Sequence, residues 1–196
     1  MTRQSYASAL DKVLGPIGFI RDGRVWNRIL DGFHDNVNLQ VSTFAGTTAN
    51  LMFKDLISEQ ILLETIPPGS PQLMFPVSER IGYFTHGTDH WWRRDPNGPQ
   101  ELSAAVEAHA PKFFDDMHSL EAQARRFGRY SDMRGPAPQR LYLAITLYRM
   151  GEKQEACDSL APRLRLRDPV WAAQMEALQR RFGCKDPGER DVGSGA

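Results

Sequence analysis

The side chains best suited to chemistry gather between residues 80 and 94. This short segment holds two histidines, two tryptophans, three arginines and an aspartate. Imidazole and carboxylate groups bind metal ions, and tryptophan and arginine dominate the energetics of many protein interfaces. We therefore take the segment as the candidate site. Its candidate partner-binding residues are Arg80, Tyr83, His86, Asp89, His90, Trp91, Trp92, Arg93 and Arg94.

One enzymatic interpretation of this segment is a metal-dependent hydrolase that uses His86, Asp89 and His90. Imidazoles four residues apart meet on one face of a helix, and zinc accepts such ligands together with a carboxylate. However, Gly87 and the strand-like flanking residues favour a turn before a strand over a helix. A zinc site also needs three or four ligands, and the sequence indicates no others. We therefore assign no metal ligand, no catalytic residue and no cofactor.

A second interpretation is a nucleic-acid binder that uses residues 91–94. Adjacent residues on a strand point to opposite faces, so one of Trp91 and Trp92 is expected in the core. The other is then covered by a helix or exposed, and with Arg93 and Arg94 beside it an exposed ring suits base stacking. The chain carries 24 Lys and Arg against 24 Asp and Glu, a formal net charge of zero. Because nucleic-acid binders usually present a basic face, we expect no such partner.

The remaining sequence favours a binding protein over an enzyme. It contains no nucleophile elbow, phosphate-binding glycine loop, dinucleotide fingerprint or His-Glu-x-x-His motif. The two cysteines, Cys157 and Cys184, are too few for a disulfide scaffold, so we expect structural thiols and a reducing compartment. No apolar run approaches the roughly 20 residues of a membrane helix, and the N-terminus lacks the order of a signal peptide. These features predict a cytoplasmic protein without a membrane partner.

An α+β domain over residues 1–128 is expected to position the candidate site. Apolar residues at helical spacing predict a helix over 5–14, and alternation predicts an antiparallel hairpin of 25–29 with 37–41, joined by 31–35. Further strands are expected at 51–57, at 61–66 or 73–77, and at 81–84. After Pro99 the helical period returns, and Pro111 divides it into two helices, of which the second ends at Gly128. The sheet is therefore expected to be covered by the N-terminal helix and by the helices after Pro99.

A small all-α appendage is expected after this domain. Clustered glycines and prolines predict a linker over 129–138, and apolar stripes predict helices within 139–183. The spacing of Leu143, Leu147, Gly151, Ala156 and Leu160 resembles a single tetratricopeptide-like helical hairpin. Residues 184–196 are expected to form a disordered tail. Residues 1–128 carry three more acidic than basic residues, and residues 129–196 carry three more basic than acidic ones. The net charge of zero is therefore the sum of a negative first part and a positive second part.

Residues 5–128 also resemble a bacterial family known only as a domain of unknown function, numbered forty-three-oh-four. The resemblance is carried by the motifs at 14–19, 37–42, 80–83 and 89–92, and by Pro111-Lys112-Phe113-Phe114 with the helix that follows. It implies an α+β fold and no established catalytic residues. The residues after Gly128 lie outside it.

These observations predict a non-enzymatic bacterial protein that binds another protein. Neutralising a toxin or scaffolding a complex would require a specific surface and no catalytic group. The sequence names neither the partner nor the oligomeric state.

Overall fold

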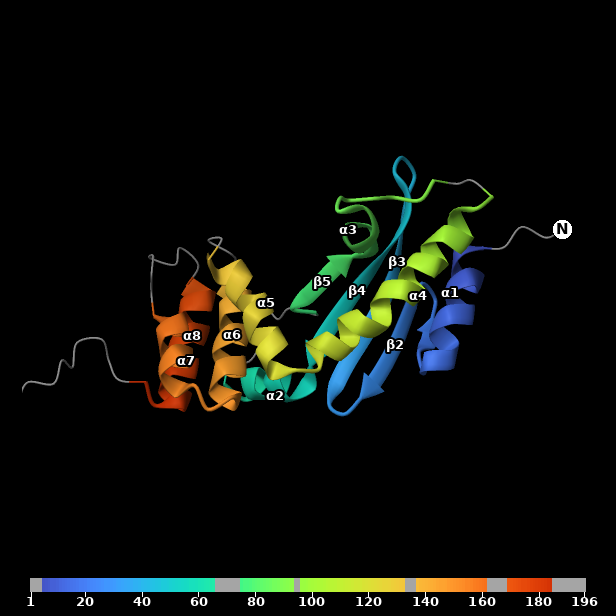
Figure 1. Ribbon diagram of the computed structural model, residues 1–196. Helices are drawn as coiled ribbons and strands as arrows, with labels where there is room; N and C mark the ends of the chain where they lie inside the picture. The colour runs from blue at the N-terminus through green and yellow to red at the C-terminus, as the bar shows by residue number, and fades with distance from the viewer. Residues whose placement is uncertain (1–4, 66–74, 94–95, 133–136, 162–168, 185–196) are drawn as a thin grey trace, which may run out of the picture. The chain divides into compact units, whose positions relative to one another are not determined.

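The computed structural model of the protein describes residues 5–65, 75–93, 96–132, 137–161 and 169–184 (Figure 1). The chain divides into two compact units. The first unit comprises residues 1–59 and 73–122, and the second comprises residues 60–72 and 123–196. Residues 60–72 thus belong to the second unit although they lie within the sequence of the first, an arrangement that the sequence did not indicate.

The first unit is built on an antiparallel sheet with the strand order β1-β2-β3-β4-β5. The strands are β1 (Ile20–Asp22), β2 (Val25–Leu30), β3 (Phe33–Ser42), β4 (Gly46–Asp55) and β5 (Val77–Arg80). The turn between β2 and β3 contains only Asp31 and Gly32, with φ of 51° and 84°, and two positive φ values in a two-residue turn suit a tight hairpin. The predicted hairpin is confirmed, with a turn shorter than the expected 31–35.

Two helices cover one face of this sheet (Figure 1). Helix α1 (Tyr6–Leu14) begins after Ser5, whose Oγ accepts a hydrogen bond from the Ser8 N–H at 3.1 Å and so caps the first turn. Helix α4 (Gly98–Met117) lies beside α1 on the same face. The buried side chains of β3 and β4 that form the core of this layer are Val37, Leu39, Ala49, Leu51 and Phe53. The α+β fold class predicted from the sequence is therefore confirmed.

Pro111 lies inside α4, so the predicted division into two helices at this residue is wrong. Proline costs the helix about 3 kcal/mol. Phe113 and Phe114 are both buried close by, and burial of two such rings, about 2 kcal/mol each, offsets that cost. Helix α4 ends instead at Met117, and α5 (Leu120–Asp132) follows.

Gly128 lies within α5, so this helix extends past the end predicted for it. A glycine inside a helix costs only about 1 kcal/mol relative to alanine and does not by itself end the helix. Residues 129–132, which were expected in a linker, continue α5, and Ala137 and Pro138 of that linker begin α6. Residues 133–136 of the expected linker lie outside the described part of the chain.

Two of the predicted strands are helices. Residues 81–84 belong to α3 (Ile81–His86), and residues 61–65 belong to α2 (Leu56–Thr65), which also takes the last two residues of the strand expected at 51–57. Asp55 marks the change from strand to helix, because its Oδ1 accepts hydrogen bonds from the N–H groups of Ile57 and Ser58 at 3.0 and 3.2 Å. Of the alternative strand at 73–77, only Val77 lies in β5, and residues 73–74 are outside the described part.

The second unit is helical, as predicted for 139–183. Helices α6 (Ala137–Arg149) and α7 (Lys153–Leu160) are separated by Gly151, whose φ of 90° suits glycine, and α8 (Pro169–Phe182) follows. The Tyr148 and Phe182 rings stack with centroids 4.1 Å apart. The buried apolar side chains of these helices include Leu141, Ile145, Ala156, Leu160, Leu178 and Phe182. Among the described residues, no helix combines the length and apolar character that crossing a membrane requires.

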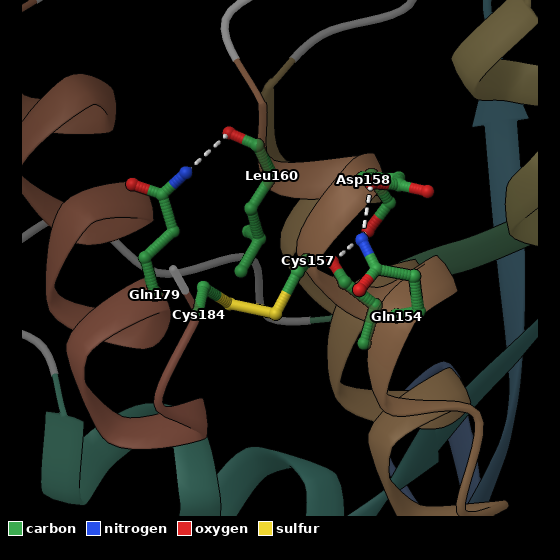
Figure 2. Close-up of a disulfide and its surroundings, with 8 residues drawn as sticks. Gln154, Cys157, Asp158, Leu160, Gln179 and Cys184 are labelled. Atoms are coloured by element: carbon green, nitrogen blue, oxygen red, sulfur yellow. Dashed lines mark hydrogen bonds between the residues drawn. A yellow bond between two sulfur atoms is a disulfide. The ribbon is translucent and has the colours of Figure 1, made fainter. Parts of the chain in front are cut away.

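Cys157 and Cys184 form a disulfide, so the prediction of two structural thiols is wrong (Figure 2). The bond joins α7 to the residues that follow α8, with the two Cα atoms 5.6 Å apart. The Cys184 N–H also donates to the Gln179 carbonyl oxygen at 3.0 Å. Cys184 is thus part of the folded unit and not of the tail predicted for 184–196, whose other residues lie outside the described part. The bonded pair also removes the argument for a reducing compartment that rested on free thiols.

Candidate partner-binding site

The predicted site residues come from the end of β5, from α3 and from the loop that follows α3. Helix α3 ends at Gly87, which has a φ of 67° and whose N–H donates to the Tyr83 carbonyl oxygen. The loop then returns along α3 so closely that a Cβ on Gly82 would lie 2.5 Å from the His90 backbone nitrogen. Only glycine permits this approach without a shift of the backbone, so Gly82 fixes where the loop carries its side chains.

Arg80 brings together two other predicted residues. Its Nη1 donates a hydrogen bond to Asp89 Oδ2 and forms an ion pair with it. Its Cζ lies 4.8 Å from the centroid of the Trp91 ring, a cation–π contact. The hydrogen bond from Arg80 lowers the pKa of the Asp89 carboxyl below its usual value, so Asp89 is ionised at neutral pH. The guanidinium group is thus held between a carboxylate and an indole ring.

Tyr83 and His86 extend this arrangement along α3. The Tyr83 side chain is 52% exposed, and His86 is also exposed. We call the surface formed by Arg80, Tyr83, His86, Asp89 and Trp91 the α3 surface. It combines a fixed cation at the end of β5 with an exposed phenol on α3 and a partly exposed indole in the loop that follows.

The two tryptophans differ in burial, and one of them lies in the core, as the sequence predicted. Trp92 is the core residue, with 4% of its surface exposed. Its N–H donates to the Thr47 carbonyl oxygen and its own carbonyl oxygen accepts from the Thr47 N–H, both at 2.8 Å, which adds a bridge beside β4. Trp91 is partly exposed and lies against Arg80. The sequence left open which ring was buried, and the bridge to Thr47 decides it.

His86 and His90 form a second group with Trp92. The two imidazole rings stack with centroids 3.9 Å apart, and the His90 ring meets the Trp92 ring edge-on at 4.6 Å. Burial lowers the pKa of His90, and the electrostatic effect of the neighbouring His86 lowers it further, whereas Glu101 opposes the shift. The stack therefore favours a neutral His90.

This lowered pKa predicts that the first unit loses stability on mild acidification. Because the unfolded chain protonates His90 more readily than the folded protein does, stability falls as the pH drops below the ordinary imidazole value of about 6.5. His34 acts in the same direction, since burial and then the Lys54 charge lower its pKa. The lowered pKa of Asp89 also contributes to stability, but this contribution is lost only when the pH falls to about 4 and below. It therefore does not affect a comparison between pH 5 and pH 7.5.

We expect a lower melting temperature at pH 5 than at pH 7.5, measured by circular dichroism, and a smaller difference for His90→Gln. Equal pH dependence in the wild type and in His90→Gln would contradict this role of His90.

The metal-site interpretation receives no support from the described residues. In these residues, no group of three or more His, Cys, Asp or Glu side chains is placed to hold a metal ion. Asp89 pairs with Arg80, while His86 and His90 stack on each other. Of the other predicted residues, Arg93 is exposed, and its carbonyl oxygen accepts a hydrogen bond from Tyr6 Oη at 2.6 Å. Arg94 lies outside the described part.

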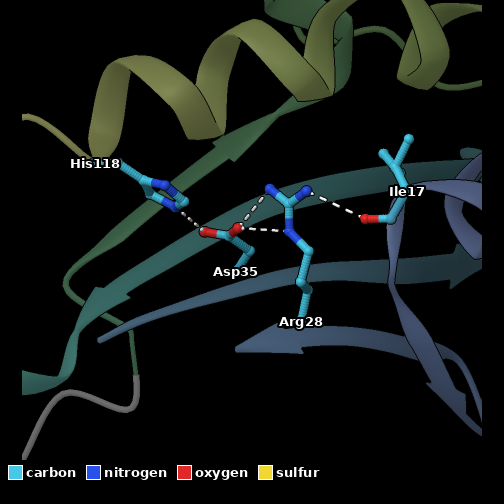
Figure 3. A network of polar contacts seen from close by, with 4 residues as sticks. All are labelled: Ile17, Arg28, Asp35 and His118. Atoms are coloured by element: carbon cyan, nitrogen blue, oxygen red, sulfur yellow. Dashed lines mark hydrogen bonds and ion pairs between the residues drawn. The ribbon is translucent and has the colours of Figure 1, made fainter. Parts of the chain in front are cut away.

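A buried ionic network in the first unit was not predicted from the sequence (Figure 3). Asp35 is fully buried, and its Oδ2 accepts hydrogen bonds from Arg28 Nε and Nη2 at 3.0 and 2.7 Å. Its Oδ1 lies 3.0 Å from His118 Nε2, and the His118 ring stacks on Phe33. Arg28 Nη1 also donates to the Ile17 carbonyl oxygen at 3.2 Å. The network ties β2 and β3 to the end of α4.

The signal for this network lay in the hairpin register. Arg28 and Asp35 are directly paired once the turn is limited to residues 31 and 32. With a turn of 31–35, Asp35 counts as a loop residue and the pair cannot be seen.

Comparison with known proteins finds no match to the chain, whether among protein-family models, curated proteins or solved structures. The resemblance of residues 5–128 to the bacterial family of unknown function therefore stays a prediction.

Proposed function

We propose that the protein binds another protein through the α3 surface. The observation that carries this proposal is the Trp91 ring stacked against Arg80, with the exposed Tyr83 on the same short helix and loop. Tryptophan, tyrosine and arginine are the residues whose truncation most often weakens protein complexes. Because the Arg80–Asp89 ion pair and the cation–π contact already order these side chains, binding costs less conformational entropy.

The proposed setting is the neutralisation of a toxin or the scaffolding of a complex in a bacterial cytoplasm. Both roles require a specific surface and no catalytic group. In the cytoplasm the Cys157–Cys184 disulfide would meet cellular reductants, so its redox state there is open to direct measurement. Metal-dependent hydrolysis and nucleic-acid binding remain alternative hypotheses, and no observation in the described residues favours either of them.

Affinity capture from extracts of the encoding organism tests the proposal. We expect one specific partner with the wild-type protein and its loss with Trp91→Ala or Tyr83→Ala. Truncating a central interface residue costs about 2 kcal/mol or more, which corresponds to roughly thirtyfold weaker binding. Affinities for the identified partner are then measured by calorimetry.

Phe44→Ala is the matched control, because Phe44 is a fully exposed aromatic residue in the β3–β4 turn and outside the α3 surface. It is expected to keep the partner at wild-type affinity. An unchanged partner list and affinity in Trp91→Ala and Tyr83→Ala would refute the proposed surface.

A further inference from the structure

A pair of stacked imidazoles holds the loop after α3 against this helix. His86 is the last residue of α3 and His90 lies in the loop. Their ring centroids are 3.9 Å apart, with an angle of 14° between the ring planes. The two residues on either side of His90 are the ones that contact Arg80. The stack therefore helps to place Asp89 and Trp91 on the α3 surface.

This contact is favourable only while the two rings carry at most one positive charge. Two protonated rings would place like charges 3.9 Å apart, a distance at which each disfavours the charged form of the other. Burial, and then the nearby His86, lowers the pKa of His90 below its ordinary value. The folded loop therefore takes up a second proton less readily than a loop that has left α3.

The other groups that face the stack do not neutralise a second charge. Glu101 of α4 favours the charged form of His90, but its effect is smaller than those of burial and of His86. From β4, the Thr48 hydroxyl donates to the His90 carbonyl oxygen at 3.3 Å and is uncharged. On α3, Thr85 Oγ1 lies 2.6 Å from His86 Nδ1 and is likewise uncharged.

The contacts on both sides of the stack determine which residues can move. Trp92 is buried, and its N–H and carbonyl oxygen both bond to Thr47 at 2.8 Å, so this end of the loop is fixed. At the other end, a Cβ on Gly87 would meet no atom within 4 Å, so the turn has room to change. Arg80 and Asp89 pair with each other and supply no spare counter-charge. Repulsion between the rings is therefore relieved by movement of residues 87–91.

We propose that the His86–His90 stack is a pH switch of the α3 surface, which opens when both rings are protonated. Because the opened loop binds one proton more, acidification favours it by up to about tenfold per pH unit below the ordinary imidazole pKa of about 6.5. Opening removes Asp89 and Trp91 from Arg80 and so breaks up the α3 surface. This inference rests on the proposed function, and it predicts that the protein releases its partner on mild acidification.

Nuclear magnetic resonance of the full chain tests the switch without the partner. At pH 7.5 we expect a nuclear Overhauser contact between the Arg80 side chain and the Trp91 ring. At pH 5 we expect this contact to be lost, whereas the Trp92 amide keeps its bond to Thr47 and the amides of β3 and β4 keep their chemical shifts. A His90→Gln variant cannot carry two charges at the stack, so it is expected to keep the contact at pH 5.

His34→Gln is the matched control, because burial and then the Lys54 charge also lower the pKa of His34, which lies on β3 and outside the stack. It is expected to lose the Arg80–Trp91 contact at pH 5, as the wild type does. A wild type that keeps the contact at pH 5, or a His90→Gln variant that loses it, would overturn the proposal. Loss of the β3 and β4 signals at the same pH would also overturn it, because that result means global unfolding.

The switch and the proposed function fail in different ways. Affinity capture at pH 7.5 that yields no partner refutes the proposed function, whereas the resonance experiment decides on the switch without a partner. A captured partner that binds with the same affinity at pH 7.5 and pH 5 refutes the switch and leaves the proposed function standing.

Discussion

Replacing Asp35 with alanine is expected to lower the free energy of unfolding of the first unit by about 3–5 kcal/mol. The Asp35 carboxylate is fully buried and accepts two hydrogen bonds from Arg28, so its removal leaves a largely buried guanidinium group without its counter-charge. His118 loses its carboxylate partner at the same time. Chemical denaturation followed by circular dichroism measures the loss.

Asp116→Ala is the control for the Asp35 prediction. Asp116 also forms an ion pair, with Lys112 four residues earlier in α4, but both side chains are mostly exposed. Exposed pairs of this kind contribute only about 0.5 kcal/mol. Similar small losses for Asp35→Ala and Asp116→Ala would show that the buried network does not stabilise the fold.

Removing the disulfide is expected to destabilise the second unit by about 3 kcal/mol, within the usual range for a bond that closes a loop of this size. Cys157 and Cys184 are 27 residues apart, and the bond holds the end of α8 against α7. In the Cys157→Ser/Cys184→Ser variant, backbone amides of α7 and α8 are expected to exchange hydrogen faster. Those of α4, in the first unit, are expected to keep their wild-type rates.

Reductant supplies the control for the disulfide prediction. It is expected to destabilise the wild-type protein to the level of the double serine variant and to leave that variant unchanged. Equal stability of the oxidised wild type and the variant would contradict a stabilising bond. Thiol labelling of freshly lysed cells tests the proposed cytoplasmic location. Mostly free thiols at Cys157 and Cys184 would support that location, and a fully oxidised pair would oppose it.

Elements with a clear hydrophobic period could be predicted from the sequence. The stripe of residues 5–14 with its Ser5 cap specifies α1, and the alternation on both sides of residue 31 specifies the β2–β3 hairpin. The burial of one of the two adjacent tryptophans was also expected from strand geometry. In each case the signal is local, because it depends on spacing within about ten residues.

Features that depend on tertiary contacts could not be predicted in this way. The short apolar run at 81–84 fits either a strand or a helix. In the structure it is a helix, and Gly82 of that helix packs against the His90 backbone, a contact that the local spacing does not indicate. The Asp35 network requires the exact register of the hairpin, and the disulfide requires α7 and the end of α8 to meet. The spacing of residues along the sequence specifies neither the hairpin register nor the contact between α7 and the end of α8.

Similarly, the candidate site was only partly visible in the sequence. Composition indicated residues 80–94, but the contact of Arg80 with both Asp89 and Trp91 depends on the return of the loop along α3. The same return separates Trp92, which enters the core, from the residues of the α3 surface.

Site-specific photo-crosslinking in cells tests the central claim, partner binding through the α3 surface, most directly. A photoreactive phenylalanine derivative is placed at Tyr83 in one strain and at Phe44 in another, since both positions are exposed and aromatic. We predict a discrete crosslinked protein from position 83 and none from position 44. No crosslink from position 83, or the same products from both positions, would contradict the claim.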